Sequence, residues 1–341
     1  MGSFDAKMIM PKQLTWFRSA LTGVLVFLLL LVFVGAIVRA TGAGLGCPDW
    51  PRCWGAVIPP WKVEQVNLDK LDFEKFQLKA ERLGRDPAEV TPDSILDSFN
   101  PVHTWTEFVN RLVTIPIGLF AVAAVIFGVL LPKFRDRWQL RLVSVLSLLI
   151  ILLNAWMGRQ IVYSGLKPGV ITTHLALAIG LIVILVYGRW VAVGKPKFQR
   201  SSPLLLISVI GLLLLVVAEG IMGAQVRELT DELGKNFQGF DRSMWIDQIE
   251  KSSVYLIHRS FSWLIVIATL GCWWGARRLG IVDWRANAVL VLVLAMMVMG
   301  VVLAHVAILP LVQVLHVGAA ALMITFITDW LLRLSWGFRK T

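Results

Sequence analysis

Charged residues are scarce in this chain of 341 residues: they make up 16% of it, whereas 57% is hydrophobic and the mean hydropathy is +0.72. This balance excludes a water-soluble globular protein. The sequence also lacks the alternating segments of about ten residues that are typical of an outer-membrane barrel. It has instead eight apolar stretches, each close to the roughly 20 residues that cross about 30 Å of hydrocarbon. The composition predicts an all-α integral membrane protein with eight transmembrane helices, which begin near Trp16, Thr106, Gln139, Val170, Pro203, Val254, Arg285 and Pro310.

A cleavable signal and an Arg- and Ser-rich presequence are also missing from the first residues. The first apolar stretch has the full length of a span and no small-residue cleavage site. We therefore expect it to remain as the first span, in a bacterial inner membrane rather than in an organelle.

Lysine and arginine collect at alternate ends of the expected spans, which predicts that both termini are cytoplasmic. The net charge of +11 then reflects topology and attraction to anionic membrane lipid, and nucleic acid is not an expected partner. The residues that carry this prediction are Lys7, Lys12, Arg18, Lys133, Arg135, Arg137, Arg141, Lys195, Lys197, Arg200, Arg277, Arg278, Arg285, Arg339 and Lys340.

Two long segments fall on the external side under this topology, from Thr41 to about Trp105 and from Arg227 to about Ser253. Both are rich in charge. The first contains an amphipathic stretch from Leu68 to Leu83, which predicts a surface helix.

Cysteine is rare as well, with three residues in the chain. Cys47 and Cys53 lie just outside the first span, where an oxidising compartment would allow a disulfide. Three roles remain open for them: a structural clip, a redox-active pair and a metal site. Cys272 lies in the sixth span, and we expect it to be a small packing residue.

The two halves of the chain resemble copies of each other. A shift of 142 residues pairs Gly158 with Gly300, Pro168 with Pro310 and His174 with His316. Two further strings also pair, although the loops between them differ in length: Asn110-Arg111 with His258-Arg259, and Gly35-Ala-Ile-Val-Arg39 with Gly223-Ala-Gln-Val-Arg227. We therefore expect two pseudo-symmetric four-helix bundles, in residues 1–200 and 201–341.

Histidines inside apolar spans usually serve a function. A neutral imidazole is a strong iron ligand, and two histidines on facing helices can hold a haem from both sides. His258 and His316 form such a pair, and each lies about one turn inside the external end of its span. The second half therefore predicts a haem site near the external side.

The first half differs at one of these positions. His174 keeps its place, but Asn110 stands where the second half has His258, and asparagine is a poor iron ligand. A site with one strong ligand favours substrate chemistry over pure electron transfer. Glu107 lies one turn before Asn110 on the same helix face, where it could move protons, stabilise positive charge or extend toward the membrane surface. His103, one turn further out, is an alternative ligand or a solvated residue.

Four arginines complete the repeat-symmetric positions: Arg39, Arg111, Arg227 and Arg259. Arginine binds carboxylates such as haem propionates, and it also satisfies carbonyls at helix ends, so both interpretations stay open. His305 corresponds to Tyr163 in the first half, and we interpret it as interfacial or structural rather than as a ligand.

At these residues the chain resembles the haem A synthase family. The resemblance rests on five strings that together reach nearly all eight spans. They are Val34-Gly-Ala-Ile-Val-Arg-Ala-Thr-Gly-Ala-Gly-Leu-Gly-Cys-Pro-Asp-Trp-Pro-Arg-Cys53, Glu107-Phe-Val-Asn-Arg111, Gly165-Leu-Lys-Pro-Gly-Val-Ile-Thr-Thr-His174, Ile257-His-Arg-Ser260 and Leu315-His316.

The resemblance implies that His258 and His316 ligate a haem B cofactor and that His174 faces a substrate, haem O. It implies a catalytic role for Glu107 and matches Cys47 and Cys53 to an external cysteine pair. The implied reaction oxidises the C8 methyl group of haem O to a formyl group with oxygen from water, for cytochrome oxidase assembly. Haem O synthase and a second copy of the chain are further expected partners.

One departure from the family is Asn110, where histidine is common. The first half then holds haem O through His174 alone, or with His103 or water on the opposite side. Two alternative functions remain open at this point: a membrane b-type cytochrome that transfers electrons, and a non-catalytic haem carrier or oxidase-assembly factor.

Overall fold

The computed structural model describes residues 12–82, 86–134, 136–198, 202–236 and 246–334. Eight long helices run through these ranges, and no strand occurs within them. The long helices are α1 (Lys12–Ala40), α4 (Pro101–Leu130), α5 (Arg137–Tyr163), α6 (Val170–Ala192), α7 (Pro203–Asn236), α9 (Ser253–Arg278), α10 (Trp284–His305) and α11 (Pro310–Arg333). Three short α-helices, α2 (Phe73–Arg82), α3 (Pro92–Asp97) and α8 (Ile246–Lys251), lie in the connections.

All eight long helices are long and apolar enough to cross a membrane. The shortest, α10, has 22 residues, which extend for about 33 Å at 1.5 Å per residue. The prediction of an all-α membrane protein with eight spans is confirmed. Helices α6, α7 and α11 begin at the expected residues, whereas α4 begins earlier, at Pro101, because Asn100 caps it by accepting a hydrogen bond from the backbone N–H of His103.

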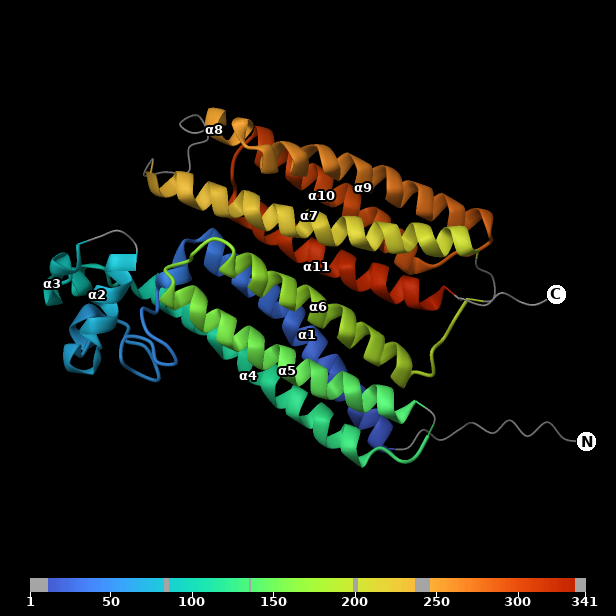
Figure 1. Ribbon diagram of the computed structural model, residues 1–341, viewed down its shortest axis with the longest axis horizontal. Helices are drawn as coiled ribbons and strands as arrows, with labels where there is room; N and C mark the ends of the chain where they lie inside the picture. The colour runs from blue at the N-terminus through green and yellow to red at the C-terminus, as the bar shows by residue number, and fades with distance from the viewer. Residues whose placement is uncertain (1–11, 83–85, 135, 199–201, 237–245, 335–341) are drawn as a thin grey trace, which may run out of the picture.

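The long helices pack in two sets (Figure 1). In the first set, α1 and α5 each pack against both α4 and α6. In the second set, α7 and α10 each pack against both α9 and α11. Helix α11 also contacts α1 and α6, so the two sets share a seam, and one apolar core of buried residues runs through both.

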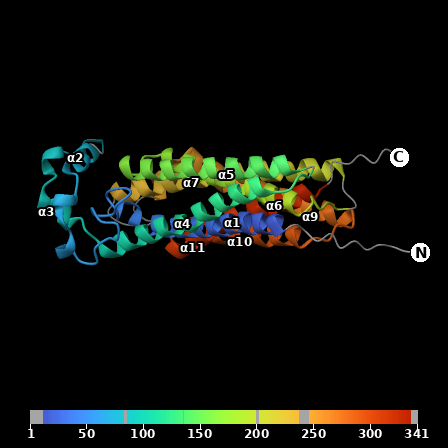
Figure 2. The same cartoon turned by 90° about the horizontal axis from the view of Figure 1, so that it is seen from below.

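The long helices run nearly parallel, and α2 and α3 lie beyond one end of them (Figure 2). The first residue of α1 and the last residue of α11 lie at the opposite end (Figure 1). The ends of α4, α6 and α9 that lead into α5, α7 and α10 are at this opposite end too (Figure 1). The basic residues used above for topology lie in these connections or in the adjoining helix turns: Lys133, Arg137, Arg141, Lys195, Lys197, Arg277, Arg278 and Arg285. Of the basic residues used above for topology, Lys7, Arg135, Arg200, Arg339 and Lys340 lie outside the described residues.

The segment from 41 to 100 packs around the cysteine pair. Cys47, Cys53, Trp54, Leu71 and Ile95 form a buried apolar cluster that is separate from the core of the spans. The predicted surface helix is shorter than expected: a 3-10 turn at Leu68–Lys70 comes first, and α2 follows. The 3-10 turn and α2 are separated at Leu71, which is buried in the apolar cluster. Leu83, the last residue of the predicted helix, lies outside the described residues.

The second expected external segment was placed too early. Helix α7 continues past Arg227 as far as Asn236, and α8 occupies part of the remainder. The charged residues there stabilise the helix, because Arg227 pairs with Asp231 one turn later at 2.8 Å. Buried Leu233 packs with Ile249 and Tyr255, so this polar-looking stretch has an apolar side.

Candidate functional site

Each expected ligand position faces a glycine on a neighbouring helix. A Cβ atom on Gly223 of α7 would lie 3.2 Å from Cε1 of His258 on α9, and one on Gly300 of α10 would lie 4.0 Å from Cε1 of His316 on α11. In the first set, Gly158 of α5 has the same relation to His174 of α6, at 3.8 Å. Because glycine has no side chain, each imidazole can lie directly against the backbone of the neighbouring helix.

The fourth position repeats this geometry without a histidine. A Cβ on Gly35 of α1 would lie 3.6 Å from the Oδ1 atom of Asn110 on α4. Oδ1 of Asn110 is buried and has no hydrogen-bond partner among the described residues. The structure thus puts Asn110 in the place that the repeat assigned to it, opposite the same kind of glycine.

His258 and His316 belong to opposed helices of one set. Both α9 and α11 pack against α7 and against α10, so they face each other across the set. Neither Nδ1 atom makes a hydrogen bond to a described group, although a carboxylate oxygen lies 3.1 Å from Nδ1 of His258. Two half-buried imidazoles with unsatisfied nitrogens on opposed helices fit an iron held from both faces.

Sequence reasoning missed Glu219 of α7, which the structure brings to His258. Its Oε1 atom lies 3.1 Å from Nδ1 of His258, while its Oε2 atom is buried without a hydrogen-bond partner among the described residues. The available signal was a single carboxylate in the apolar run from Pro203 to Arg227, since an ionisable residue at membrane depth usually has a function.

His174 has a different neighbour, Asn154 of α5, which was also missed. With its amide nitrogen turned toward the imidazole, Asn154 donates to Nδ1 of His174 at 3.0 Å and to its backbone carbonyl at 3.0 Å. An amide can donate or accept at one place by turning over, so it suits either tautomer of the ring. Asn154 therefore orients His174 without imposing a charge on it.

Glu107 and Arg111 hold the loop that contains the cysteines. Glu107 is 5% exposed, accepts a hydrogen bond from the backbone N–H of Cys47 at 2.8 Å and forms an ion pair with Arg111. Arg111 also donates to the backbone carbonyls of Asp49 at 2.9 Å and Arg52 at 2.8 Å. Both residues thus connect the external loop to the helix that carries Asn110.

Cys47 and Cys53 form a disulfide. The two residues are 0% and 1% exposed, because Trp54 and the neighbouring cluster cover them. Gly46 is required for this packing: a Cβ there would lie 2.3 Å from the backbone oxygen of His103. Cys272 is buried and free within α9, as expected of a packing residue.

Two of the repeat-symmetric arginines meet at one carboxylate. Arg39 of α1 and Arg227 of α7 each lie 2.8 Å from an oxygen of Asp231, and Arg227 also donates to the backbone carbonyl of Arg39 at 2.9 Å. Arg259 is exposed on α9, with its guanidinium 5.8 Å from the centre of the Tyr255 ring. Their role as propionate ligands stays a prediction.

The two remaining histidines are not among the glycine-facing positions. His103 is half-buried in the first turn of α4, and His305 is exposed at the last residue of α10. Among the described residues, no three His, Cys, Asp or Glu side chains gather as a metal cluster. A haem site with two axial histidines does not require one.

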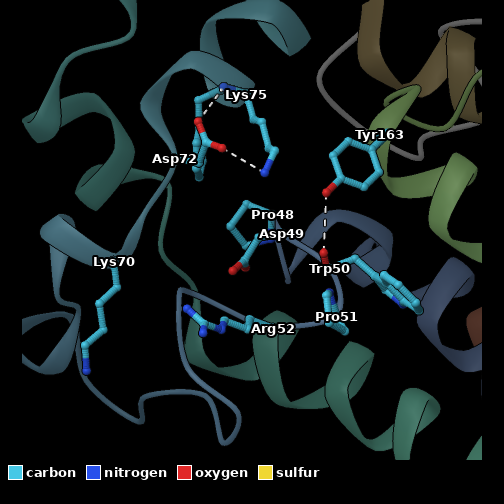
Figure 3. Close-up of a pocket in the computed structure, with 10 residues that line it drawn as sticks. Pro48, Asp49, Trp50, Pro51, Arg52, Lys70, Asp72, Lys75 and Tyr163 are labelled. Atoms are coloured by element: carbon cyan, nitrogen blue, oxygen red, sulfur yellow. Dashed lines mark hydrogen bonds and ion pairs between the residues drawn. The ribbon is translucent and has the colours of Figure 1, made fainter.

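A cavity of about 350 Å³ lies outside the spans, over the cysteine loop (Figure 3). Pro48, Trp50 and Arg52 line one side, and Lys75 and Tyr163 line the other. Lys75 donates to Asp72, which lowers the pKa of that carboxyl, and the same contact raises the pKa of Lys75. The cavity is separate from the glycine-facing histidines, and we assign no ligand to it.

Eight apolar helices with paired intramembrane imidazoles define a class of protein: a multi-span helical membrane protein with the ligands that haem proteins use. A family model described as cytochrome oxidase assembly protein (COX15-CtaA) matches residues 18–328. The chain belongs to this family, which is that of the haem A synthases.

Curated relatives carry the name haem A synthase. The protein of Shewanella oneidensis is 28% identical over 202 residues, 58% of this chain and 52% of that protein. The protein of Caulobacter vibrioides is 30% identical over 190 residues, 51% of this chain and 49% of that protein, so the matches span about half the length of both relatives. The protein of Rhizorhabdus wittichii is 24% identical over 339 residues, 89% of each chain.

Proposed function

We propose that this protein is a haem A synthase, which oxidises the C8 methyl group of haem O to a formyl group by successive hydroxylations with oxygen from water. The observation that carries the proposal is the difference between the halves: two opposed imidazoles in one, and one imidazole opposite an amide in the other. Two strong ligands suit an electron-transfer cofactor, whereas a single strong ligand suits a substrate that must be bound and released.

The cofactor site belongs to residues 201–341, where His258 and His316 would hold haem B. When bound, haem B supplies one-electron transfer. The protein contributes two imidazoles set against Gly223 and Gly300, with a carboxylate beside one of them. Arg227 and Arg259 are the propionate candidates of this half, and Arg39 is the candidate of the other half.

The substrate site belongs to residues 1–200, where His174 would hold haem O and Asn110 would leave the opposite side open to His103 or water. Conversion of the methyl group to a formyl group consumes one water and releases four electrons and four protons, so the reaction requires an external electron acceptor. Glu107 is placed one turn from Asn110, where its negative charge would stabilise positive charge that develops on the substrate. Arg111, Cys47 and Cys53 would maintain the loop above this site.

The topology follows from the basic residues at one end of the helices. We place that end, and both termini, in the cytoplasm of a bacterium and the segment with Cys47 and Cys53 outside the inner membrane. The two helix sets are then the pseudo-symmetric four-helix halves. The product would serve cytochrome oxidase assembly, haem O synthase would supply the substrate, and a second copy of the chain is a further candidate partner.

Expression in a host that makes haem O but lacks its own haem A synthase tests the proposal. Extracted haems are identified by chromatography and mass spectrometry, with a control synthase in the same host. Haem A confirms catalysis despite Asn110. Accumulation of unconverted haem O beside a working control would contradict the proposal.

A second candidate function is a membrane b-type cytochrome or a non-catalytic haem carrier of oxidase assembly. It is favoured by Asn110, which removes one ligand, and by the engagement of Glu107 with Cys47 and Arg111. A carrier would return haem O unchanged, so the same extraction separates the two functions.

A further inference from the structure

A carboxylate lies at membrane depth beside one of the two proposed cofactor ligands. Glu219 belongs to α7, within the candidate span from Pro203 to Leu233, and is 8% exposed. Its Oε1 atom is 3.1 Å from Nδ1 of His258. Burial of a carboxylate in a span is costly unless a partner compensates for the lost hydration, so this contact requires a reason.

Among the corresponding positions of the repeat, only the one beside His258 holds a carboxylate. Glu219 lies four residues before Gly223, the glycine that faces His258. At the same distance before Gly158 is Asn154, whose amide meets His174, and at the same distance before Gly300 is Met296. The three corresponding positions thus hold a carboxylate, an amide and a thioether, and only the carboxylate beside His258 is anionic.

The contact is aimed at the nitrogen that an iron-bound histidine uses for its second interaction. When one ring nitrogen binds a metal, the other N–H is normally held by a carboxylate, a carbonyl or water, which fixes the ring and makes it a stronger donor. Nδ1 of His258 makes no hydrogen bond to any described group, and the Glu219 carboxylate at 3.1 Å forms an ion-pair contact with it. Glu219 is therefore the group available for this role.

We propose that Glu219 is a positioning residue for the cofactor haem: it accepts the Nδ1–H of His258, directs Nε2 toward the iron and strengthens the donation of that ligand. The proposal rests on the haem B site of the proposed function. A stronger donor stabilises ferric over ferrous iron, so Glu219 lowers the midpoint potential of this haem. The two axial ligands then differ, with His258 the more basic one.

The control for this proposal is on the same helix. Glu228 accepts a hydrogen bond from the Thr172 hydroxyl at 2.9 Å and caps the start of α6 near the Gly169 N–H at 3.3 Å. These hydrogen bonds connect α7 to α6, and none of them involves an imidazole. Glu228→Gln therefore makes the same chemical change in α7 without touching a ligand.

The experiment is a redox titration of the purified full-length protein loaded with haem B, with absorption and electron paramagnetic resonance spectra of the oxidised form. Glu219→Gln is expected to keep the low-spin spectrum of two imidazoles and to raise the midpoint potential. We expect a roughly tenfold loss of the ferric preference, which corresponds to 59 mV for one electron. Glu228→Gln is expected to leave the potential unchanged.

Each outcome has a definite meaning. A potential in Glu219→Gln equal to that of the wild type would overturn the inference while the haem site stands. A wild type without a bis-imidazole spectrum, or one whose spectrum survives His258→Ala, would overturn the proposed site and the inference together. If Glu219→Gln fails to accumulate, Glu219→Met copies the residue at position 296, removes the buried charge, and is expected to raise the potential by at least as much.

Discussion

The two helix sets present the same backbone arrangement to different side chains. In the second set, glycines on α7 and α10 face His258 and His316; in the first, glycines on α1 and α5 face Asn110 and His174. The segment between α1 and α4 adds a second difference, because the disulfide loop is bound to α4 through Glu107 and Arg111. Under the proposed function, one set would hold the cofactor haem through two imidazoles, whereas the other would bind the substrate through one imidazole beside the disulfide loop.

The largest expected effect comes from making the second set resemble the first. His258→Asn should abolish the bis-imidazole haem spectrum, because an amide is a poor iron ligand, and the haem content of the purified protein should fall accordingly. Absorption spectra and haem-to-protein ratios measure this. His305→Asn is the matched control, since that histidine is exposed at the end of α10 and faces no glycine; equal loss in the control would contradict the assignment.

Removal of the Glu107 carboxylate, which binds the disulfide loop to α4, should have the next largest effect. Glu107→Ala leaves the Cys47 N–H without its acceptor, which costs about 1–3 kcal/mol for a buried polar group, and removes the carboxylate partner of Arg111, which keeps its hydrogen bonds to backbone carbonyls. Haem A formation should fall by roughly 100-fold if the charge also serves the chemistry. Thermal unfolding and haem analysis separate the two effects. Glu74→Ala, on exposed α2, should change neither, and unaltered turnover in Glu107→Ala would exclude a catalytic role.

The reverse exchange makes the first set resemble the second. Asn110→His should give the substrate haem a second imidazole and convert its spectrum to the bis-imidazole form. We expect roughly tenfold tighter retention of haem O, because a strong ligand is added, together with slower product release. Difference spectra with added haem O measure the change. A substrate-haem spectrum identical to that of the wild type would show that position 110 does not face the iron.

A smaller effect is expected from adding a side chain to one of the glycines that face the imidazoles. A Cβ in Gly223→Ala would lie 3.2 Å from His258 Cε1, so the imidazole must shift, and overpacking of this kind costs about 1–3 kcal/mol. Haem affinity should fall several-fold in a thermal release assay. Gly271→Ala on α9 is the control, because a Cβ there meets nothing within 4 Å. Equal behaviour of the two variants would mean that His258 does not depend on Gly223.

The smallest effect is expected in the segment between α1 and α4, which is longer than the corresponding segment between α7 and α9. Lys75→Met should return the pKa of Asp72 toward its ordinary value of 3.8, measured by carbonyl chemical shift in labelled protein. Because the folded pKa of Asp72 is lowered, its contribution to stability is present above the unfolded pKa and is lost as the pH falls through the folded pKa. Both side chains are exposed, so this ion pair is screened by water and stability at neutral pH should not change.

Sequence reasoning found the features that depend on composition and spacing, and missed those that depend on contact. The eight spans and the correspondence of Asn110 with His258 follow from apolar length and from the repeat. Glu219 and Asn154 each stand alone in an apolar run, so no motif marks them; their importance appears only when α7 and α5 bring them to an imidazole. The second long segment was expected to begin at Arg227 because the residues after it are charged. Helix α7 continues to Asn236 instead, because charged residues one turn apart, such as Arg227 and Asp231, stabilise a helix.

The sequence by itself determined the class of protein, the number of spans and the side-chain types at the four repeated positions. The thickness of the hydrocarbon layer sets the length of a span, so spans can be identified from apolar length. Whether a side chain is an imidazole or an amide is given by the residue type alone. Only the tertiary structure decided that Cys47 and Cys53 are buried, that Arg39 and Arg227 meet at Asp231, and that His258 receives a carboxylate while His316 does not. Those outcomes depend on which helix faces are packed together. Helix packing brings together residues far apart in the sequence, and their spacing along the chain does not predict that they will be in contact.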